Sequence, residues 1–491
     1  MDIHQKIFKA SGKTFCLVTS LLLLVQCSVS DKEKTEWSDN IKVVLENTKP
    51  LEYDQGNRLP LYLWPAIYPG DLDTEAAEQL VSELAKRGVG IISTWNINDT
   101  IESLHQCLTI ARAQKKLGKR VNVNANPLLY SFFNGDERTA HIEKNGKQFF
   151  DDSFGGAKMG CPFAIDFRKK EIRKRVEFFV DIYKEEGLPL DFIFTDWEID
   201  GPIEVNHAYD ASKKCTRCCE NMGLDFSFTE FQKTMREMRS YLMHYSYSIP
   251  VLSKYPDALV GNYAVYPNDG YRYWYDYFEY YVKGQPYKSD QHAKYRQWYN
   301  DFPSTGFSYA MPVVYTWDSI YKWYDFKNTD YRWFYNMLLV ASNAGKSTAQ
   351  NIPIISFVHW NTVFVSGKPD TIVKQMSEGS YQELLWHMLL RGTDTFFMWS
   401  SKNEYPEEVR LVHEVYAAAQ KFGKYLDHGL PINYSVPEYP GIVISGLALN
   451  DSVLIRRTDF GTNHEPVKIL AGTKVITINY SPGICNVLSL E

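Results

Sequence analysis

Residues 191–198 read DFIFTDWE, a short apolar run that ends in two carboxylic acids separated by one tryptophan. A run of aromatic and β-branched residues is typical of a buried strand, and side chains alternate between the two faces of a strand. We therefore expect Asp196 and Glu198 on one face and Trp197 on the other. At the end of a buried strand, this pattern predicts two acids side by side at the mouth of a pocket.

The two acids suit one kind of chemistry. Neighbouring carboxylates resist being ionised together, so one tends to keep its proton while the other stays charged. Cleavage of a glycosidic bond requires such an acid and base on a rigid support. A surface Asp and Glu after an ordinary strand would give the same three letters, so the rest of the chain has to separate the two interpretations.

Strand-like runs alternate with amphipathic helical segments along most of the chain. Strand–helix alternation repeated about eight times predicts an α/β fold, a (β/α)8 TIM-type barrel over residues 56–428. A doubly wound sheet is less well supported because no Gly-rich phosphate loop follows the first strand. Barrel active sites lie at the carboxyl ends of the strands, where Asp196 and Glu198 are expected. The predicted strands are 61–67, 89–95, 120–126, 191–198, 257–267, 307–317, 352–360 and 393–401.

The pattern changes from residue 429 onward. Short β runs are separated by turns, and no helical spacing is visible. Residues 429–491 are therefore predicted to form a small C-terminal β-sandwich domain, and nothing in its sequence suggests catalysis.

The first 27 residues have the features of a signal peptide. Lysines precede an apolar run, 15–25, that is too short to span a bilayer, and Cys27 follows it. The LLVQC stretch resembles a bacterial lipoprotein box, which would place a lipid anchor on Cys27; ordinary cleavage and secretion is the alternative. Either route predicts a secreted or lipid-anchored protein outside the cytoplasm, with residues 28–55 as a tether.

Composition limits the partners. The net charge of −6 gives no support for nucleic-acid binding, which calls for a basic patch. Aromatic residues make up 15% of the chain, and such rings often stack on sugar faces in enzymes that bind carbohydrates. We expect a polysaccharide or oligosaccharide substrate.

Three of the eight cysteines form a cluster, CTRCC at 215–219. A four-thiolate zinc site would need a second pair with matching spacing, and the sequence shows none. The pattern therefore favours a disulfide that pins the loop, and it predicts neither a metal site nor a cofactor.

Aromatic side chains occur at the ends of several predicted strands. Because strand ends converge on one pocket in a barrel, these rings are candidate substrate-binding residues. His359, at another such end, is not a persuasive catalytic base on its own. The candidates are Tyr263, Tyr266, Tyr315, Trp317, Trp360 and Trp399.

Four segments resemble the hyaluronidase family of glycoside hydrolases and, more distantly, chitinase-like barrels. TDWEIDGP (195–202) resembles the family's I-D-W-E-x-W-R-P segment, and VGNYAVYPNDGY (260–271) resembles its W-G-x-Y-x-F-P-D-C-Y segment. MPVVYTW (311–317) resembles P-S-I-Y-L-P, and SYQELLWHMLLRGTDTFFMWSS (380–401) resembles the helix and strand that deliver a pocket tryptophan. Their order and spacing agree over roughly residues 60–425.

The resemblance implies retaining, substrate-assisted hydrolysis. Glu198 falls on the family's acid, which protonates the glycosidic oxygen and then activates water. Asp196 falls on the residue that orients the substrate's 2-acetamido group while its carbonyl oxygen attacks the anomeric carbon. Tyr263 or Tyr315 would hydrogen-bond the acetamido oxygen, and Trp399 would form an apolar wall. The chain lacks the family's Trp-Arg-Pro after the acid, and its negative charge does not favour hyaluronan itself.

Two alternatives stay open at this stage. One is a two-carboxylate retaining glycosidase acting on another polysaccharide, with Asp318 or Glu383 as nucleophile. The other is a non-catalytic glycan-binding lipoprotein that uses the barrel as a cradle.

Overall fold

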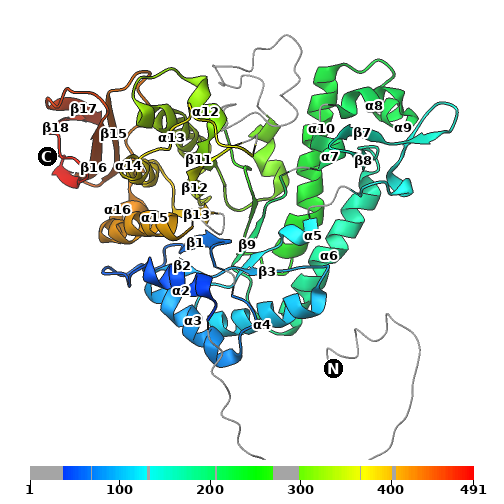
Figure 1. Ribbon diagram of the computed structural model, residues 1–491, viewed down its shortest axis with the longest axis horizontal. Helices are drawn as coiled ribbons and strands as arrows, with labels where there is room; N and C mark the ends of the chain where they lie inside the picture. Colours follow the sequence, from blue (N-terminus) through cyan, green and yellow to red (C-terminus); the bar gives the residue numbers. More distant parts are fainter. Residues whose placement is uncertain are drawn as a thin grey trace, which may run out of the picture. The chain divides into compact units, whose positions relative to one another are not determined.

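The computed structural model describes residues 37–67, 69–129, 133–198, 200–204, 207–268, 298–364, 367–400 and 405–490 (Figure 1). All of these belong to one compact unit, residues 36–491. The predicted signal peptide, with Cys27, lies outside the described residues. Within the described ranges, the structure contains no helix long and apolar enough to cross a membrane.

The centre of the molecule consists of two parallel sheets. The first has the order β11 (Val313–Trp317), β12 (Ile355–Val363), β13 (Thr395–Trp399), β1 (Leu61–Trp64) and β2 (Val89–Gly90). The second has the order β10 (Leu259–Asn262), β9 (Phe192–Thr195), β4 (Asn122–Asn124) and β3 (Ser93–Thr94). Every predicted strand position thus holds a strand of this parallel core.

The two sheets are linked at both edges. β2 and β3 follow each other in the predicted strand 89–95 and pair with different sheets. At the other edge, the Ser308 amide, in the segment that leads to β11, donates to the Val260 carbonyl of β10 at 2.9 Å. The pairings still form two sheets and not one uninterrupted ring. The parallel α/β core is therefore confirmed, whereas the closed barrel stays a prediction.

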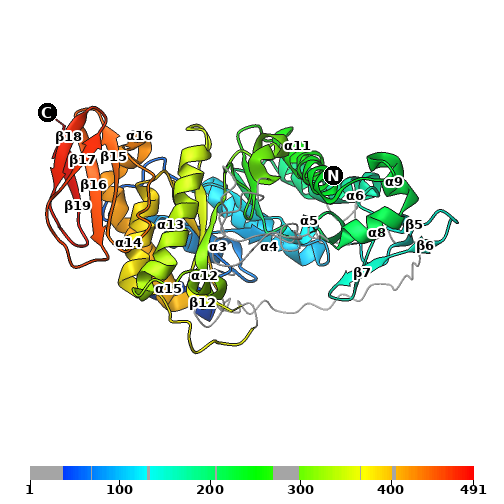
Figure 2. The ribbon, with the colours of Figure 1, turned by 90° about the horizontal axis from the view of Figure 1, so that it is seen from above.

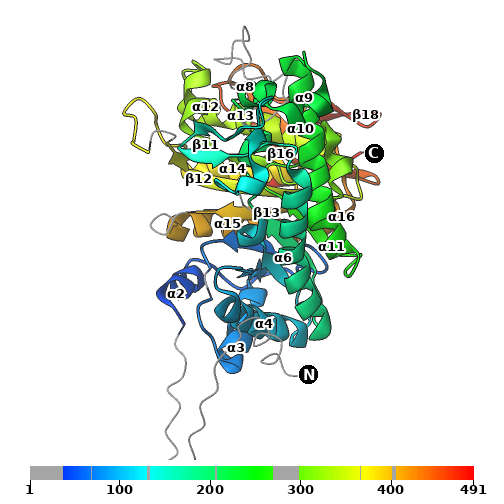
Figure 3. The same cartoon turned by 90° about the vertical axis from the view of Figure 1, so that its right-hand side faces the viewer.

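Long helices follow the strands and cover their outer faces. Each buries an apolar stripe, as α6 does with Ile172, Val176 and Phe179. α3 and α4 lie side by side (Figures 1 and 3), and they pack against β2 and β3, respectively. The long helices are α3 (Thr74–Lys86), α4 (Thr100–Lys116), α6 (Ile165–Glu185), α10 (Phe228–Met243), α13 (Thr329–Ser347), α14 (Glu378–Leu389) and α15 (Tyr405–Ala419).

The alternation of side chains on β9 divides the core into two clusters. Phe192 and Phe194 point between the sheets, where their ring centroids lie 4.3 Å from those of Tyr62 and Phe397, respectively. Ile193 points the other way and packs in the second apolar cluster, beneath the helices. The period-2 pattern expected for residues 192–194 is thus confirmed.

Two connections carry extra elements. Between β4 and α6 the chain adds α5 (Asn126–Leu129) and two hairpins, β5 (His141–Ile142) with β6 (Gln148–Phe149) and β7 (Asp151–Phe154) with β8 (Ala157–Met159). Between β9 and α10 it adds α7 (Gly201–Glu204), α8 (Ala208–Lys214) and α9 (Thr216–Met222). These additions lie side by side in Figures 1 and 2.

The C-terminal region is antiparallel, as the sequence predicts. β14 (Leu430–Pro431), β15 (Ile442–Leu449), β16 (Ser452–Asp459) and β19 (Cys485–Ser489) form one sheet, and β17 (Val467–Ala471) pairs with β18 (Lys474–Ile478) (Figure 2). Ile444, Val453 and Ile476 share one apolar cluster between the two sheets. A separate sandwich domain stays a prediction.

One part of the predicted tether, 28–55, is packed. Residues Asp39–Glu46 form helix α2, in which Ile41 and Val44 are buried against the main core. Their i, i+3 spacing presents one apolar face to the core, a short signal within an otherwise polar stretch.

Candidate active site

Asp196 and Glu198 lie directly after β9, at its carboxyl end. The strand ends at Thr195, and the Glu198 amide donates to the Asp196 carbonyl at 2.9 Å, so residues 196–198 form a tight turn instead of continuing the strand. Trp197 is fully buried, while both acids are partly exposed. The two acids are thus more exposed than Trp197, as the alternation of a strand would predict, but a turn and not a strand separates them.

The surroundings keep protons on this pair. Burial raises the pKa of Asp196 well above its ordinary value, and the neighbouring charge of Glu198 raises it further. Burial also raises the pKa of Glu198 from 4.5 to about 7, against the opposing effect of the Arg239 charge. Two coupled carboxyls of this kind cannot both ionise readily, so the pair holds a proton near neutral pH.

The backbone of Trp197 is held from two elements. The Trp197 amide donates to Asn262 Oδ1 at 2.9 Å, and Asn262 Nδ2 donates to the Trp197 carbonyl at 3.1 Å. Arg239 of α10 donates to the same carbonyl, and its guanidinium lies 4.7 Å from the centre of the Trp197 ring. Arg239 is itself fully buried and paired with Glu204 of α7. This clamp fixes the turn that carries the two acids.

Tyr263 lies near the acids, and Tyr315 and Trp399 follow it in a series of contacts. The Tyr263 amide donates to the Thr195 carbonyl at 3.0 Å, and the Tyr263 and Tyr315 hydroxyls lie 3.2 Å apart. Burial, followed by Tyr315 and the charges of Glu198 and Asp196, raises the pKa of Tyr263 well above its ordinary value, so its hydroxyl stays a neutral donor. The partly exposed Trp399 ring lies 6.3 Å from Tyr315 between centroids.

Three other candidates are packed elsewhere. Tyr266 is 1% exposed in the core. Trp317 is buried against Trp323 of α12 (Asp318–Trp323), at 5.4 Å between ring centroids, after a register shift that follows Tyr315. The Trp360 indole donates to the Met376 carbonyl at 2.8 Å, on the face of β12 opposite to His359. The role of these three rings in substrate binding stays a prediction.

Trp64, a residue that the sequence reasoning missed, lies at the end of β1. Its partly exposed ring contacts Phe194 at 5.2 Å and Phe397 at 5.9 Å, on the same interior side as Tyr62. The signal for it was present, since Trp64 is the last residue of its strand and shares the face of Tyr62.

His359 lies on the interior face of β12 beside Trp399, at 4.7 Å between ring centroids. Its Nδ1 lies 2.8 Å from Glu408 Oε2, and both side chains are buried. This pair supports the wall formed by Trp399.

The alternative nucleophiles are engaged in other contacts. Glu383 lies on α14 and pairs with Arg456 of β16 at 2.5 and 2.8 Å, so it faces the C-terminal sheet. Asp318 is buried and pairs with Lys322 at 2.9 Å. Both side chains are thus engaged by cations, and the two-carboxylate alternative stays untested.

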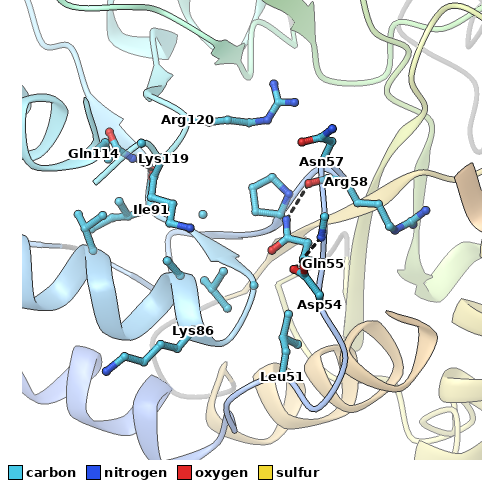
Figure 4. A pocket seen from close by; sticks show the side chains of 18 of the residues that line it. Leu51, Asp54, Gln55, Asn57, Arg58, Lys86, Ile91, Gln114, Lys119 and Arg120 are labelled. Carbon is cyan, nitrogen blue, oxygen red and sulfur yellow. Dashed lines mark hydrogen bonds between the residues drawn. The ribbon is translucent and has the colours of Figure 1, made fainter. Parts of the chain in front are cut away.

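A cavity of about 670 Å³ lies at the opposite end of the strands (Figure 4). Leu51, Arg58, Lys119 and Arg120 are among its lining residues, together with Asp191, which precedes β9. Asp191 and Asp196 flank the two ends of one strand, so this cavity is not the site of the acids. In parallel barrels the amino-terminal end of the strands serves stability.

No family model and no curated protein matches the sequence. The solved structures to which the chain is similar include several glycoside hydrolases. An α-L-fucosidase from Paenibacillus thiaminolyticus aligns with 73% of this chain and 48% of its own at 11% identity and a TM-score of 0.43. A β-galactosidase from Halorubrum lacusprofundi aligns with 76% of this chain and 59% of its own at 11% identity and a TM-score of 0.47. Bee venom hyaluronidase aligns with 59% of this chain and 85% of its own at 12% identity and a TM-score of 0.30.

The chain thus spans about half the length of the fucosidase and somewhat more of the β-galactosidase. Similarity at these TM-scores assigns neither an activity nor a substrate to the chain. The function has to be argued from the site.

Proposed function

We propose that this protein is a glycoside hydrolase in which Glu198 is the proton donor and Asp196 is the neighbouring acid that orients the substrate. The observation that carries the proposal is the coupled pair of partly exposed carboxyls held on a clamped turn at a strand end. A Glu198 pKa of about 7 suits a general acid that also has to act as a base, because catalysis is best when the pKa lies near the working pH.

The proposed substrate is a hexosamine-containing polysaccharide, cleaved with retention in the manner of the hyaluronidases. Asp196 would orient the 2-acetamido group, whose carbonyl oxygen attacks the anomeric carbon. The hydroxyls of Tyr263 and Tyr315 lie 3.2 Å apart and share a hydrogen bond, so either Tyr263 or Tyr315 would donate to the acetamido oxygen, and Trp399 would offer an apolar face to its methyl group. The engagement of Glu383 and Asp318 elsewhere supports a nucleophile supplied by the substrate.

The same proposal includes the setting of the site. The two parallel sheets would form one (β/α)8 barrel, and residues 429–491 would form a sandwich domain packed on it. Residues 1–27 would direct export, with a lipid on Cys27 or a cleaved amino terminus. Mass spectrometry of the mature amino terminus separates these two forms.

A substrate panel tests the activity. The purified chain is incubated with glycosaminoglycans, chitin-type oligosaccharides and neutral polysaccharides that lack acetamido groups, and the products are read by mass spectrometry. We expect oligosaccharide products from hexosamine-containing glycans only. Binding without any product from any glycan would contradict the proposal and favour a glycan-binding protein.

An inhibitor separates the two hydrolytic mechanisms. A thiazoline that mimics the oxazoline intermediate is added to the reaction with the glycan that the panel identifies. Competitive inhibition is expected, since transition-state and intermediate analogues bind more tightly than substrates. Unchanged turnover at saturating thiazoline would instead require an enzyme carboxylate as nucleophile.

A further inference from the structure

Four metal-binding side chains converge in the additions that follow β4 and β9. They are His141 of β5, Cys161 just after β8, Cys215 between α8 and α9, and Cys218 in α9. All four are fully buried, and their ligand atoms lie within 4.8 Å of one another. The fold thus adds two single residues, far apart in sequence, to the C-x-x-C pair at 215–218.

The spacing of the sulfur atoms matches a single tetrahedral ion. Zinc–sulfur bonds of about 2.3 Å in tetrahedral geometry separate two sulfurs by about 3.8 Å. The Sγ atoms of Cys161 and Cys218 lie 3.4 Å apart, and those of Cys161 and Cys215 lie 3.8 Å apart. A disulfide would require about 2.05 Å, and all six cysteines of the described residues are free.

His141 provides a second, independent observation. Its ring is fully buried and stacks on Phe149 at 4.9 Å between centroids. Within the described part of the chain, neither ring nitrogen has a hydrogen-bonding oxygen or nitrogen partner, and the ring faces the Cys215 thiol. A buried imidazole without such partners is costly, and a metal bond would satisfy one nitrogen.

We propose that His141, Cys161, Cys215 and Cys218 bind one zinc ion. Three thiolates and one imidazole in a tetrahedron are a donor set that zinc prefers, whereas magnesium and calcium prefer oxygen ligands. Because the protein fills all four positions, the site is structural and leaves no position for a reacting water.

The zinc ion would join two separate insertions. His141 and Cys161 belong to the connection after β4, and Cys215 and Cys218 belong to the connection after β9, which also carries Glu198. The two connections also contact each other directly, since Thr216 Oγ1 donates to the Ile142 carbonyl at 2.9 Å. Within the first connection, Gly160 lets the segment before Cys161 pass close to Thr139, because a Cβ at residue 160 would lie 2.3 Å from the Thr139 carbonyl oxygen.

A buried arginine connects this site to the turn of the acids. Arg168 of α6 donates to the Cys161 carbonyl at 2.9 Å, and its charge acts on the buried Asp200, two residues after Glu198. Loss of the ion would therefore loosen one support of the catalytic connection. The zinc proposal does not depend on the hydrolase proposal, because metal content is measured without any substrate.

Metal analysis of the protein as purified under reducing conditions is the first test. We expect about one zinc ion per chain in the parent. Cys218→Ser and His141→Gln should lose nearly all of it. Cys219→Ser is the matched control, because Cys219 neighbours Cys218 in α9 but lies outside the cluster, with its sulfur 3.5 Å from the Lys213 carbonyl. A parent without zinc that also fails to take up added Zn²⁺, or equal zinc in all variants, would overturn the proposal.

Spectroscopy on the parent avoids dependence on variants that fail to fold. X-ray absorption at the zinc edge should show three sulfurs at about 2.3 Å and one nitrogen at about 2.0 Å. Replacement of the metal by Co²⁺ should give intense thiolate charge-transfer bands together with tetrahedral ligand-field bands. An oxygen-rich shell, a different native metal, or a disulfide joining Cys161 to Cys215 or Cys218 would contradict a zinc site.

Discussion

The carboxyl group of Glu198 has a pKa near 7 because burial disfavours its charge more than Arg239 favours it. If Glu198 donates the proton, kcat/KM should fall by about tenfold per pH unit above pH 7, as the acid form disappears. A pH–rate profile on the cleaved glycan measures this. A rate that stays constant up to pH 9 would exclude a donor with the environment of Glu198.

The same raised pKa predicts a pH-dependent stability. The folded state binds the proton of Glu198 more tightly than the unfolded state does. Ionisation therefore costs stability as pH rises from about 4.5 to about 7, by up to about 3 kcal/mol above that range.

Glu198→Gln removes this cost. The variant should gain thermal stability relative to the parent at pH 8 and little at pH 4, in melting curves recorded at both pH values. Glu102→Gln, an exposed glutamate of α4, is the control and should change neither curve appreciably. An equal shift of the Glu198→Gln variant at both pH values would show that burial does not hold its proton.

Helix α10 stabilises the turn that carries Asp196 and Glu198 through one side chain, Arg239. Arg239→Met would leave Glu204 buried without its cation and remove a donor from the Trp197 carbonyl. The free energy of unfolding should fall by about 3–5 kcal/mol, the usual cost of breaking a buried ion pair. Lys233→Met, on the exposed side of the same helix, should change it by less than about 0.5 kcal/mol. Urea unfolding measures the free energy of unfolding of both variants. Equal changes for Arg239→Met and Lys233→Met would show that the contacts of Arg239 add nothing to stability.

The positions of the strands and helices are largely predictable from the spacing of apolar residues and the length of each apolar run. Phe192 and Phe194 alternate with Ile193 in the sequence, and this pattern alone predicted the strand, its interior face and the acids at its end. Arg239 could not be found in the same way, since it lies among Phe231, Met235 and Leu242 on a buried helix face where a cation is unexpected.

The helix cap of α14 and the His–Cys cluster could not be predicted from the sequence, because both depend on tertiary contacts. Ser380 with Glu383 has the spacing of a capping box, yet α14 begins one turn earlier, with Ser377 as its cap, and Ser380 donates to Asp330 of α13. His141 and Cys161 are each solitary in the sequence, so only the fold reveals that they join the C-x-x-C pair.

At the scale of the whole molecule, buried polar groups join the C-terminal sheet to the parallel core. His387 of α14 lies 2.7 Å from the Ser445 hydroxyl, and Arg391 donates to Ser445 and Ser342 at 2.7 and 2.6 Å. Both side chains are fully buried. The sheet is therefore expected to unfold together with the core.

Arg391→Met tests this coupling. It should lower the free energy of unfolding by about 3 kcal/mol, because several buried acceptors lose a charged donor. Calorimetry should still show one transition at a lower temperature. Arg410→Met, on the partly exposed face of α15, serves as the control. Two separate transitions in the parent would show that the C-terminal region unfolds independently.

The turnover of Glu198→Gln on the glycan that the parent cleaves is the most direct test of the proposed active site. Glutamine keeps the size of the side chain but cannot donate the proton, so kcat should fall by a factor on the order of a hundred or more. Glu102→Gln should keep the parental rate. Undiminished turnover of Glu198→Gln, measured beside the parent and Glu102→Gln, would remove Glu198 from the mechanism and with it the proposed hydrolase.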